Sequence, residues 1–328
     1  MEVFLKQTKS LSNKEVPSHE SRLKKQKSDF LVRLKRYRGL YLFVLIPIVY
    51  YFVYRYFPIV AQFLLSFKNF RILGGLWGSP WVGFDNYVSL FSSPETSRII
   101  INTIVISLLR LATGFVPPII LAILLFDMTS SLFRRVSQSI LYIPHFFSWV
   151  VIYAIVQAIF SPTGYINNII VSMSGQINNF LMDIKWFYPL LLGSDLWKSV
   201  GWNTIIYLAA LTNIDFQLYE AAKVDGAGPI QRIFHITLPG ILPVIAFCLT
   251  IALGNILNNA GTEQILLFYT PATYSIGDVI GTWVYRRGLG EFRYSLGAAL
   301  SQFNSVAGLI LVLCFNKISS KFFGVGIW

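Results

Sequence analysis

The sequence predicts an all-α integral membrane protein with six transmembrane helices. Its 328 residues are 55% hydrophobic and only 13% charged, whereas about a quarter of the residues in an average soluble domain are charged. The mean hydropathy is +0.59. Apolar runs recur along the chain at roughly the 20 residues that a helix needs to cross the hydrocarbon core of a bilayer. A basic segment before the first run fixes the expected orientation.

The first 38 residues form this basic segment. They contain eleven lysines and arginines against four acids, a net charge of +7. A nucleic-acid-binding arm has a similar composition. However, a basic flank beside a span is held in the cytoplasm, and we favour that interpretation. The segment lacks the apolar core and cleavage site of a secretory signal, so we expect it to be retained.

Six apolar runs are long enough to be spans. In chain order they cover about residues 40–67, 99–126, 139–160, 188–211, 241–260 and 296–315. We therefore divide the chain into a cytoplasmic tail (1–38), a first span with its external loop (39–98), a core domain (99–318) and a C-terminal cytoplasmic tail (319–328). Within the core domain, the segment 212–240 is also expected in the cytoplasm.

No cofactor or metal site is predicted in this chain. Cys248 and Cys314 lie in apolar runs, where a free cysteine packs as a small hydrophobic group. The three histidines share no metal-ligand spacing. A glycine-rich phosphate loop of the Walker type is absent from the sequence, so we do not expect the chain to hydrolyse nucleotides.

The cytoplasmic segment contains a compact polar stretch, LYEAAKVDGAGPIQRIFHITLPG, at residues 218–240. Asp215 is placed to cap a short helix, FQLYEAAKV, because its carboxylate can accept free backbone N–H groups. Gly226 and Gly228 supply the backbone freedom of a sharp turn. Pro229 suits the first turn of a second helix, and Pro239 is expected to end that helix. An ordinary inter-span loop is the alternative interpretation.

This stretch resembles the EAA signature of the permease subunits of binding-protein-dependent ABC importers. The signature positions are occupied by Glu220, Ala221, Ala222, Gly226, Ile236, Leu238 and Pro239, and Asp225 and Ala227 match its common extension. The resemblance continues through SPWVGFDNYVSLF (79–91), YIPHFFSWVV (142–151), LWKSVGWNTIIYLAAL (196–211) and the terminal GVGIW (324–328). These segments are similar to oligosaccharide and polysaccharide permeases, most closely to those for aldouronates, pectin fragments and alginate.

The resemblance implies a type I ABC importer permease fold and a transport subunit rather than an enzyme. A second, homologous permease would pair with this chain in the inner membrane of a bacterium. Two ATPase subunits would carry ATP and magnesium, and an external binding protein would deliver an oligo- or polysaccharide, acidic ones such as alginate included. The signature residues, together with Tyr219 and Gly228, would form the ATPase-coupling element, and Glu220 would pair with a basic group of the ATPase.

Polar side chains inside the spans are candidates for the substrate path, because polar groups in lipid are costly and face protein or a wet cavity. The candidates are Arg110 in the second span, Trp149, Tyr153 and Gln157 in the third, Asn255, Asn258 and Asn259 in the fifth, and Gln302 and Asn304 in the sixth. Asn255, Asn258, Asn259 and Thr262 follow helical spacing, so we expect them on one face. Bonding between helices is the alternative role for such groups.

Charged side chains near the spans carry further expectations. Arg110 has no acid on its own predicted helix, so the carboxylate of an acidic polysaccharide is a candidate partner. Asp195 and Lys198 are expected to pair with each other. In the external segment, Arg286, Arg287 and Arg293 are expected to meet an acidic sugar or the binding protein.

Two other function classes stay open at this point. An ion-coupled carrier often places acids or histidines mid-membrane and is often built from inverted repeats. Here Asp195 is the only acid in a predicted span, and no such repeat is evident. A membrane enzyme of polysaccharide assembly would need a carboxylate pair or a metal cluster, which the loops do not clearly contain.

Overall fold

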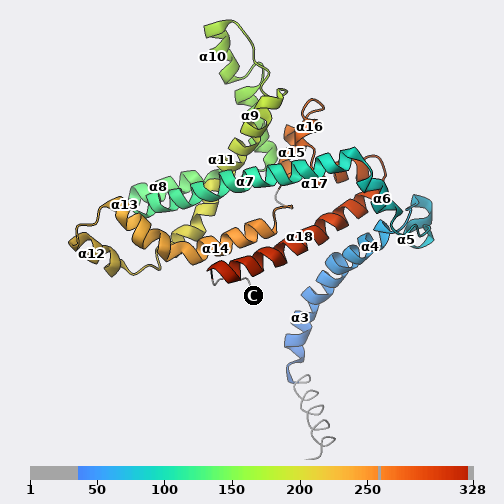
Figure 1. Ribbon diagram of the computed structural model, residues 1–328, viewed down its shortest axis with the longest axis horizontal. Coiled ribbons are helices and arrows are strands. Elements are labelled where there is room, and N and C mark those ends of the chain that lie inside the picture. Colours follow the sequence, from blue (N-terminus) through green and yellow to red (C-terminus); the bar gives the residue numbers. More distant parts are fainter. Residues whose placement is uncertain (1–35, 258–259, 324–328) are drawn as a thin grey trace, which may run out of the picture. The chain divides into compact units, whose positions relative to one another are not determined.

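A computed structural model describes residues 36–257 and 260–323, and the chain divides into two compact units, Met1–Ala61 and Gln62–Trp328. The described residues form helices and two isolated β-bridges, with no strand among them. Figure 1 labels the helices along the chain. The first helices are α3 (Arg38–Tyr51) and α4 (Phe57–Ser66), joined by a π-helical turn, Phe52–Tyr56.

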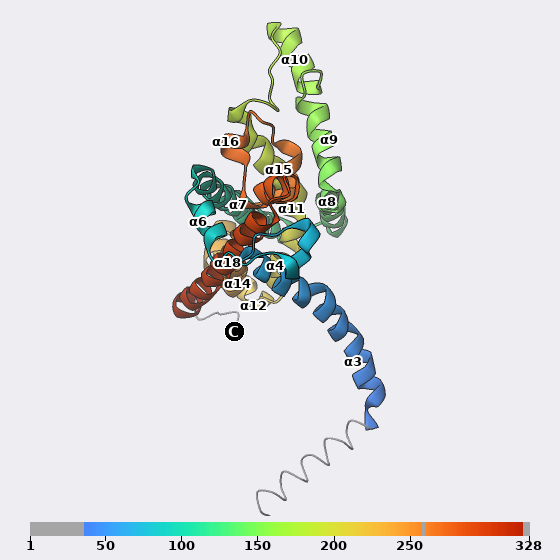
Figure 2. The same ribbon diagram turned by 90° about the vertical axis from the view of Figure 1, so that its right-hand side faces the viewer.

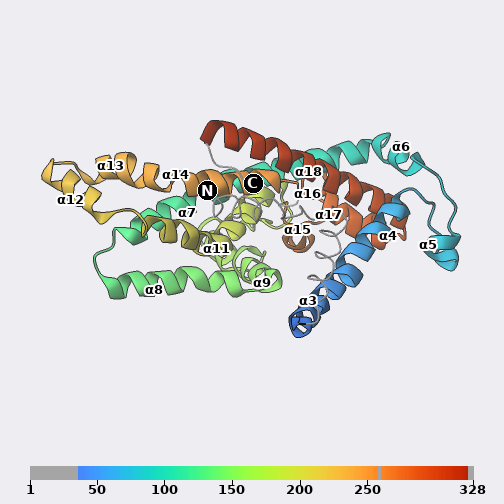
Figure 3. The same cartoon turned by 90° about the horizontal axis from the view of Figure 1, so that it is seen from below.

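Four long helices form the frame of the second unit. They are α7 (Pro94–Phe126), α11 (Ile184–Leu211), α14 (Leu238–Gly254) and α18 (Tyr294–Phe323). Helix α7 packs along α11, and α14 packs along α18, while α14 also contacts α11 and α7 (Figure 3). Side chains of α7, α11 and α14 line a large cavity.

Five helical stretches are long and apolar enough to cross a membrane, namely Arg38–Ser66, Pro94–Phe126, Trp149–Met173, Pro229–Gly254 and Tyr294–Lys321. These correspond to five of the six predicted spans. The other predicted span is α11, which has 28 residues but carries Asp195 and Lys198, and these charges lower its hydropathy. The predicted class, an all-α membrane protein, is confirmed.

The third span begins later than the sequence predicts. Residues expected at its start belong to a separate helix, α8 (Ser131–Tyr142), and to a 3-10 turn, Ile143–Phe146. Ser148 then caps α9 (Trp149–Phe160) by accepting the N–H of Val151 at 3.4 Å. The break follows from Pro144 in the 3-10 turn, since proline has no N–H for a helix to use. Helix α10 (Tyr165–Ser174) follows α9 (Figure 2).

The expectation that Pro239 ends its helix is wrong. The helix α13 (Pro229–Arg232), a π-turn (Ile233–Thr237) and α14 form one continuous run of 26 residues. The N–H of Leu238 bonds to the carbonyl of Ile233 five residues back, so the chain passes the proline through a wider turn instead of breaking. The same device precedes Pro58, which lies two residues beyond the π-turn of the first span.

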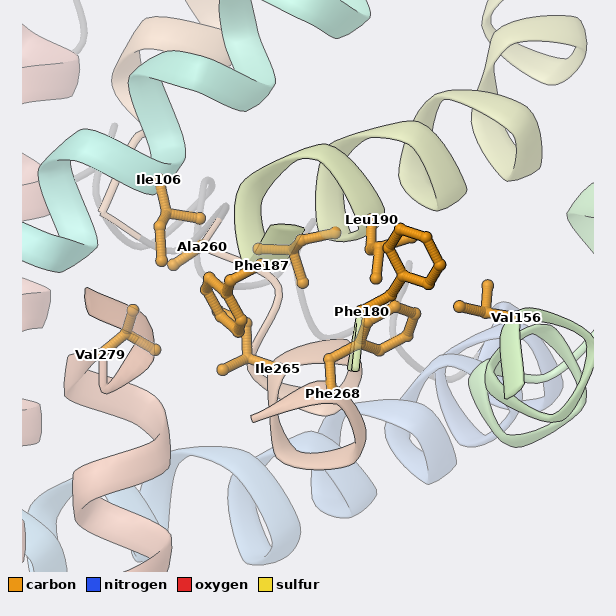
Figure 4. Close-up of a cluster of buried hydrophobic side chains, with 10 residues drawn as sticks. Ile106, Val156, Phe180, Phe187, Leu190, Ala260, Ile265, Phe268 and Val279 are labelled. Atoms are coloured by element: carbon orange, nitrogen blue, oxygen red, sulfur yellow. The ribbon is translucent and has the colours of Figure 1, made fainter. Parts of the chain in front are cut away.

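Shorter helices complete the described chain. They are α5 (Gly75–Gly78), α6 (Asp85–Phe91), α12 (Phe216–Val224), α15 (Thr262–Phe268), α16 (Tyr274–Gly277) and α17 (Ile280–Trp283), with a 3-10 turn at Ile72–Gly74 and a π-turn at Val284–Leu289. A buried apolar cluster holds α15 against α7 and α11 (Figure 4). Its members include Ile106, Phe187, Leu191 and Ile265. This packing fixes the position of the neighbouring Gln264, a buried residue of α15.

Candidate functional site

A cavity of about 830 Å³ lies among α7, α11 and α14. Apolar side chains make up much of its wall, and polar or aromatic groups interrupt them at Arg110, Asp195, Ser199, Trp202 and Asn203. Ligand pockets commonly have this character, with a mostly apolar lining and a few polar groups that orient the ligand. Of the residues predicted to form the substrate path, Arg110 lines this cavity.

Arg110 and Asp195 form a buried ion pair on the cavity wall. The Nη1 atom of Arg110 lies 2.9 Å from Oδ1 of Asp195, and the two side chains are only 9% and 19% exposed. The Nη2 atom donates to Oε1 of Gln264, while Nε2 of Gln264 donates to Ser194 Oγ at 2.9 Å. The acid that pairs with Arg110 therefore lies on a different helix, α11. The sequence pattern of α7 alone could not reveal it.

The expected pair between Asp195 and Lys198 is replaced by other contacts. Lys198 Nζ donates to the backbone carbonyls of His145, at 2.7 Å, and Phe147. It also lies 5.4 Å from the centroid of the Trp149 ring. Carbonyls near a helix break lack intrahelical donors. Lys198 therefore supplies hydrogen-bond donors to two backbone carbonyls between α8 and α9.

The other candidates in the third span, Trp149, Tyr153 and Gln157, lie on α9 and do not line the cavity. Tyr153 packs against Phe268, with ring centroids 4.9 Å apart, and joins the edge of the buried cluster. Gln157 is exposed. Packing therefore accounts for the positions of Trp149 and Tyr153 in this chain.

The predicted polar face at the end of the fifth span is wrong. Helix α14 ends at Gly254 with Asn255 as its C-cap, and Thr262 begins a different helix after Gly261, whose φ is +75°. Gly254 also packs so closely on Val312 of α18 that an added Cβ would collide with it. Asn258 and Asn259 lie outside the described residues.

The sixth-span candidates lie on α18. Asn304 lines a second cavity of about 240 Å³, together with Ser301, Ser305 and Thr262. Gln302 is half-buried on the same helix and does not line either of these two cavities. The sixth span thus contributes one of its two amides to a polar cavity.

The stretch predicted to lie in the cytoplasm folds as the sequence predicts up to Pro239, which does not end the second helix. Asp215 caps α12 by accepting the N–H of Gln217 at 2.9 Å. Gly226 has a φ of +77°, a left-handed conformation that glycine adopts at little cost. Pro229 is the first residue of α13, and Gln231 closes the turn by accepting the N–H of Gly228 at 2.8 Å. Helix, sharp turn and second helix are confirmed.

One side of α12 is buried against the rest of the unit, and the other side is exposed. Tyr219 is 7% exposed, and its hydroxyl lies 3.1 Å from Oγ1 of Thr237 in the π-turn before α14. Leu218 and Val224 are 53% and 89% exposed, and Glu220 is exposed too. None of the ion pairs within residues 36–257 and 260–323 uses Glu220. Beside α12, a hollow of about 440 Å³ is lined by Ala222, Asp225, Gly226, Ala227, Gln231, Arg232, His235 and Ile236.

The three arginines of the segment predicted to be external are paired with acids. Arg286 pairs with Asp278, Arg287 lies 2.7 Å from Glu291, and Arg293 lies 3.2 Å from Glu291. Burial lowers the pKa of Arg286, but the charge and hydrogen bond of Asp278 together with Tyr269 raise it by more, so the pKa stands above its ordinary value. These arginines therefore belong to a network of ion pairs within the chain, and Arg293 is its most exposed member at 54%.

Comparison with known proteins identifies the chain. Residues 114–320 match the family described as binding-protein-dependent transport system inner membrane components. The chain belongs to this family. It is a membrane-spanning transport component and not an enzyme, as the sequence predicted, and the secondary-carrier alternative has no support.

Similar proteins cover nearly the whole of this permease. Protein LplB of Bacillus subtilis is 38% identical, with 89% of this chain and 92% of LplB aligned. The polygalacturonan/rhamnogalacturonan transport system permease protein YteP of the same organism is 37% identical, over 93% of this chain and 95% of YteP. A solved bacterial ABC transporter involved in import of the acidic polysaccharide alginate has a chain that is 39% identical, with a TM-score of 0.83 over 90% of this chain and 99% of that one.

The sequence patterns did not predict several polar residues around the cavity of this permease. Ser199, Trp202 and Asn203 line it, and Gln264 bonds to Arg110. The signal for the first three was available, because Ser199, Trp202 and Asn203 lie on the same predicted span as Asp195, within reach of one helical face. Gln264 could not be found this way, since it lies in a segment predicted to be external.

Proposed function

We propose that this permease forms part of the path for an oligo- or polysaccharide in an ATP-driven importer. The supporting observation is the similarity over nine-tenths of the chain to the permease of a transporter that imports alginate. YteP and LplB are similar over a comparable length, and the name of YteP specifies polygalacturonan and rhamnogalacturonan. Amide, hydroxyl and aromatic groups in the cavity suit a ligand rich in hydroxyls.

An acidic saccharide such as alginate is included in this proposal on the strength of those relatives. Arg110 is already neutralised by Asp195, so it does not offer a free positive charge in this arrangement. The other substrate-path candidates stay in the proposal with weaker support. They are Trp149, Tyr153, Gln157, Asn255, Asn258, Asn259, Gln302 and Asn304.

The importer would contain a second, homologous permease, two ATPase subunits and an external binding protein. ATP and magnesium would bind the ATPases. The complex would lie in the inner membrane of a bacterium, and the net charge of +7 on the first 38 residues supports a cytoplasmic N-terminus. An even number of spans then leaves the C-terminus in the cytoplasm.

Helix α12 and its turn would be the element that meets an ATPase. The proposal covers Tyr219, Glu220, Ala221, Ala222, Asp225, Gly226, Ala227, Gly228, Ile236, Leu238 and Pro239. The exposed apolar residues Leu218 and Val224 offer a contact surface, and Glu220 offers an unused carboxylate for a basic group. ATP-driven closure would move α12 as a rigid body and change the accessibility of the cavity.

The coupling role predicts the result of two substitutions. Glu220→Ala removes the proposed contact with the ATPase, and Gly226→Val forces a branched residue into a left-handed conformation. We expect each to reduce sugar uptake and sugar-stimulated ATP hydrolysis by roughly tenfold, the range of a typical coupling free energy. Uptake is measured in proteoliposomes that contain the complete complex and its binding protein.

Arg135→Ala serves as the matched control, because it removes an exposed charge from α8, outside the signature stretch. It should leave uptake close to that of the wild type. The coupling proposal fails if Glu220→Ala and Gly226→Val complexes keep full uptake and still purify with stoichiometric ATPase.

A further inference from the structure

Trp202 presents an aromatic ring to the large cavity. It lies on α11, lines the cavity and is 43% exposed. One ring face is covered by the imidazole of His145, with centroids 4.3 Å apart and planes within 3° of parallel. Phe146 meets the indole edge-on at 5.8 Å. The ring is therefore supported from the 3-10 turn between α8 and α9.

The support behind Trp202 is itself firmly held. Lys198 lies one helical turn before Trp202, on the same side of α11, and donates to the carbonyl of His145 at 2.7 Å. Gly201, next to Trp202, lets α11 approach the backbone of Leu141 so closely that no Cβ would fit between them. Two contacts from one stretch of α11 thus hold the turn that carries His145.

Polar groups flank the ring within the same cavity. Ser199 and Asn203 line the wall beside Trp202, where a hydroxyl and an amide can donate to and accept from sugar hydroxyls. An aromatic ring buries a large apolar area in a fixed geometry, and the C–H face of a sugar ring is a flat apolar surface that fits it. The combination suits a pyranose or furanose ring better than a compact ion.

We propose that Trp202 is the surface on which a sugar ring of the substrate stacks within the cavity, and that His145 is a positioning residue that holds the indole there. The proposal rests on the saccharide substrate proposed above and specifies where that substrate is recognised. Trp197 provides a comparison, because it lies on the same helix and is also 43% exposed but is not part of the cavity wall.

The test compares Trp202→Leu, Trp202→Phe and Trp197→Leu in the complete reconstituted complex. The probes are an alginate pentasaccharide, an oligogalacturonate and an arabino-oligosaccharide, with binding measured by titration calorimetry and uptake measured in proteoliposomes. Trp202→Leu should weaken binding about fivefold or more, as expected for loss of an aromatic stacking contact. Trp202→Phe should fall between that variant and the wild type, and Trp197→Leu should match the wild type.

His145 is tested by His145→Ala and His145→Phe. The alanine variant should weaken sugar binding, and the phenylalanine variant should restore it, because a flat ring again covers the indole. A lower melting temperature of His145→Ala with unchanged affinity would show a purely structural role and overturn the positioning assignment.

The outcomes separate this inference from the saccharide proposal. If the wild-type complex takes up none of the three probes, the saccharide proposal fails, and this inference fails with it. If the wild type takes up a probe and Trp202→Leu binds it as well as Trp197→Leu does, only the role of Trp202 is overturned. If Trp202→Leu does not assemble, the comparison of Trp202→Phe with the wild type decides.

Discussion

Replacing Asp195 with asparagine is expected to destabilise the permease by about 3–5 kcal/mol, the usual effect of removing one partner from a buried ion pair. The side chain of Arg110 is only 9% exposed, so it would keep its charge in a mostly buried position after losing the carboxylate that neutralises it. Gln264 accepts one hydrogen bond from it but cannot supply a negative charge. The melting temperature of the purified complex and its monodisperse fraction in size-exclusion chromatography measure the loss.

Two further variants show whether the ion pair is responsible. Asp183→Asn changes an exposed acid on the same helix, and asparagine can still cap α11 there, so it should melt like the wild type. Arg110→Met combined with Asp195→Leu replaces both charges with apolar groups and should recover much of the stability. A wild-type melting temperature for Asp195→Asn would contradict the structural importance of the pair.

Replacing Gly201 with alanine is expected to remove most of the folded permease. Gly201 is buried where α11 meets α8, and the new methyl group would collide with the backbone carbonyl of Leu141. A backbone atom cannot turn aside as a side chain can, so the two helices would have to separate, and overpacking of this kind costs about 1–3 kcal/mol or more. Yield of monodisperse protein and melting temperature report the effect.

Gly193→Ala is the matched control for Gly201→Ala. Gly193 lies on the same helix, and an added Cβ would meet nothing within 4 Å. Alanine favours a helix over glycine by about 0.8–1.0 kcal/mol, so this variant should equal or exceed the wild type in stability. If both alanine variants behave alike, helix propensity and not the close approach governs the result.

Local chemistry made α12 and its turn predictable from the sequence, whereas the cavity depends on long-range packing that the sequence does not reveal. Asp215, Gly226 and Pro229 act on neighbours in the chain, so their pattern predicted a cap, a turn and a second helix. The partners Arg110 and Gln264 are 154 positions apart, and only the fold brings them together. Gly and Asn are common helix-stop residues, but the expectation for the fifth span did not use Gly254 and Asn255, where α14 ends beside the tight contact of Gly254 on Val312.

The passage of the chain through Pro239 without a break has a mechanical consequence. The helical run from Pro229 to Gly254 has 26 residues, which at about 1.5 Å per residue is a rod of roughly 39 Å. One end adjoins the turn after α12, and farther along Cys248 and Ala252 form part of the cavity wall. Because the run is continuous, a displacement of α12 of the kind proposed above would be passed along it to Cys248 and Ala252 and would alter the width of the cavity.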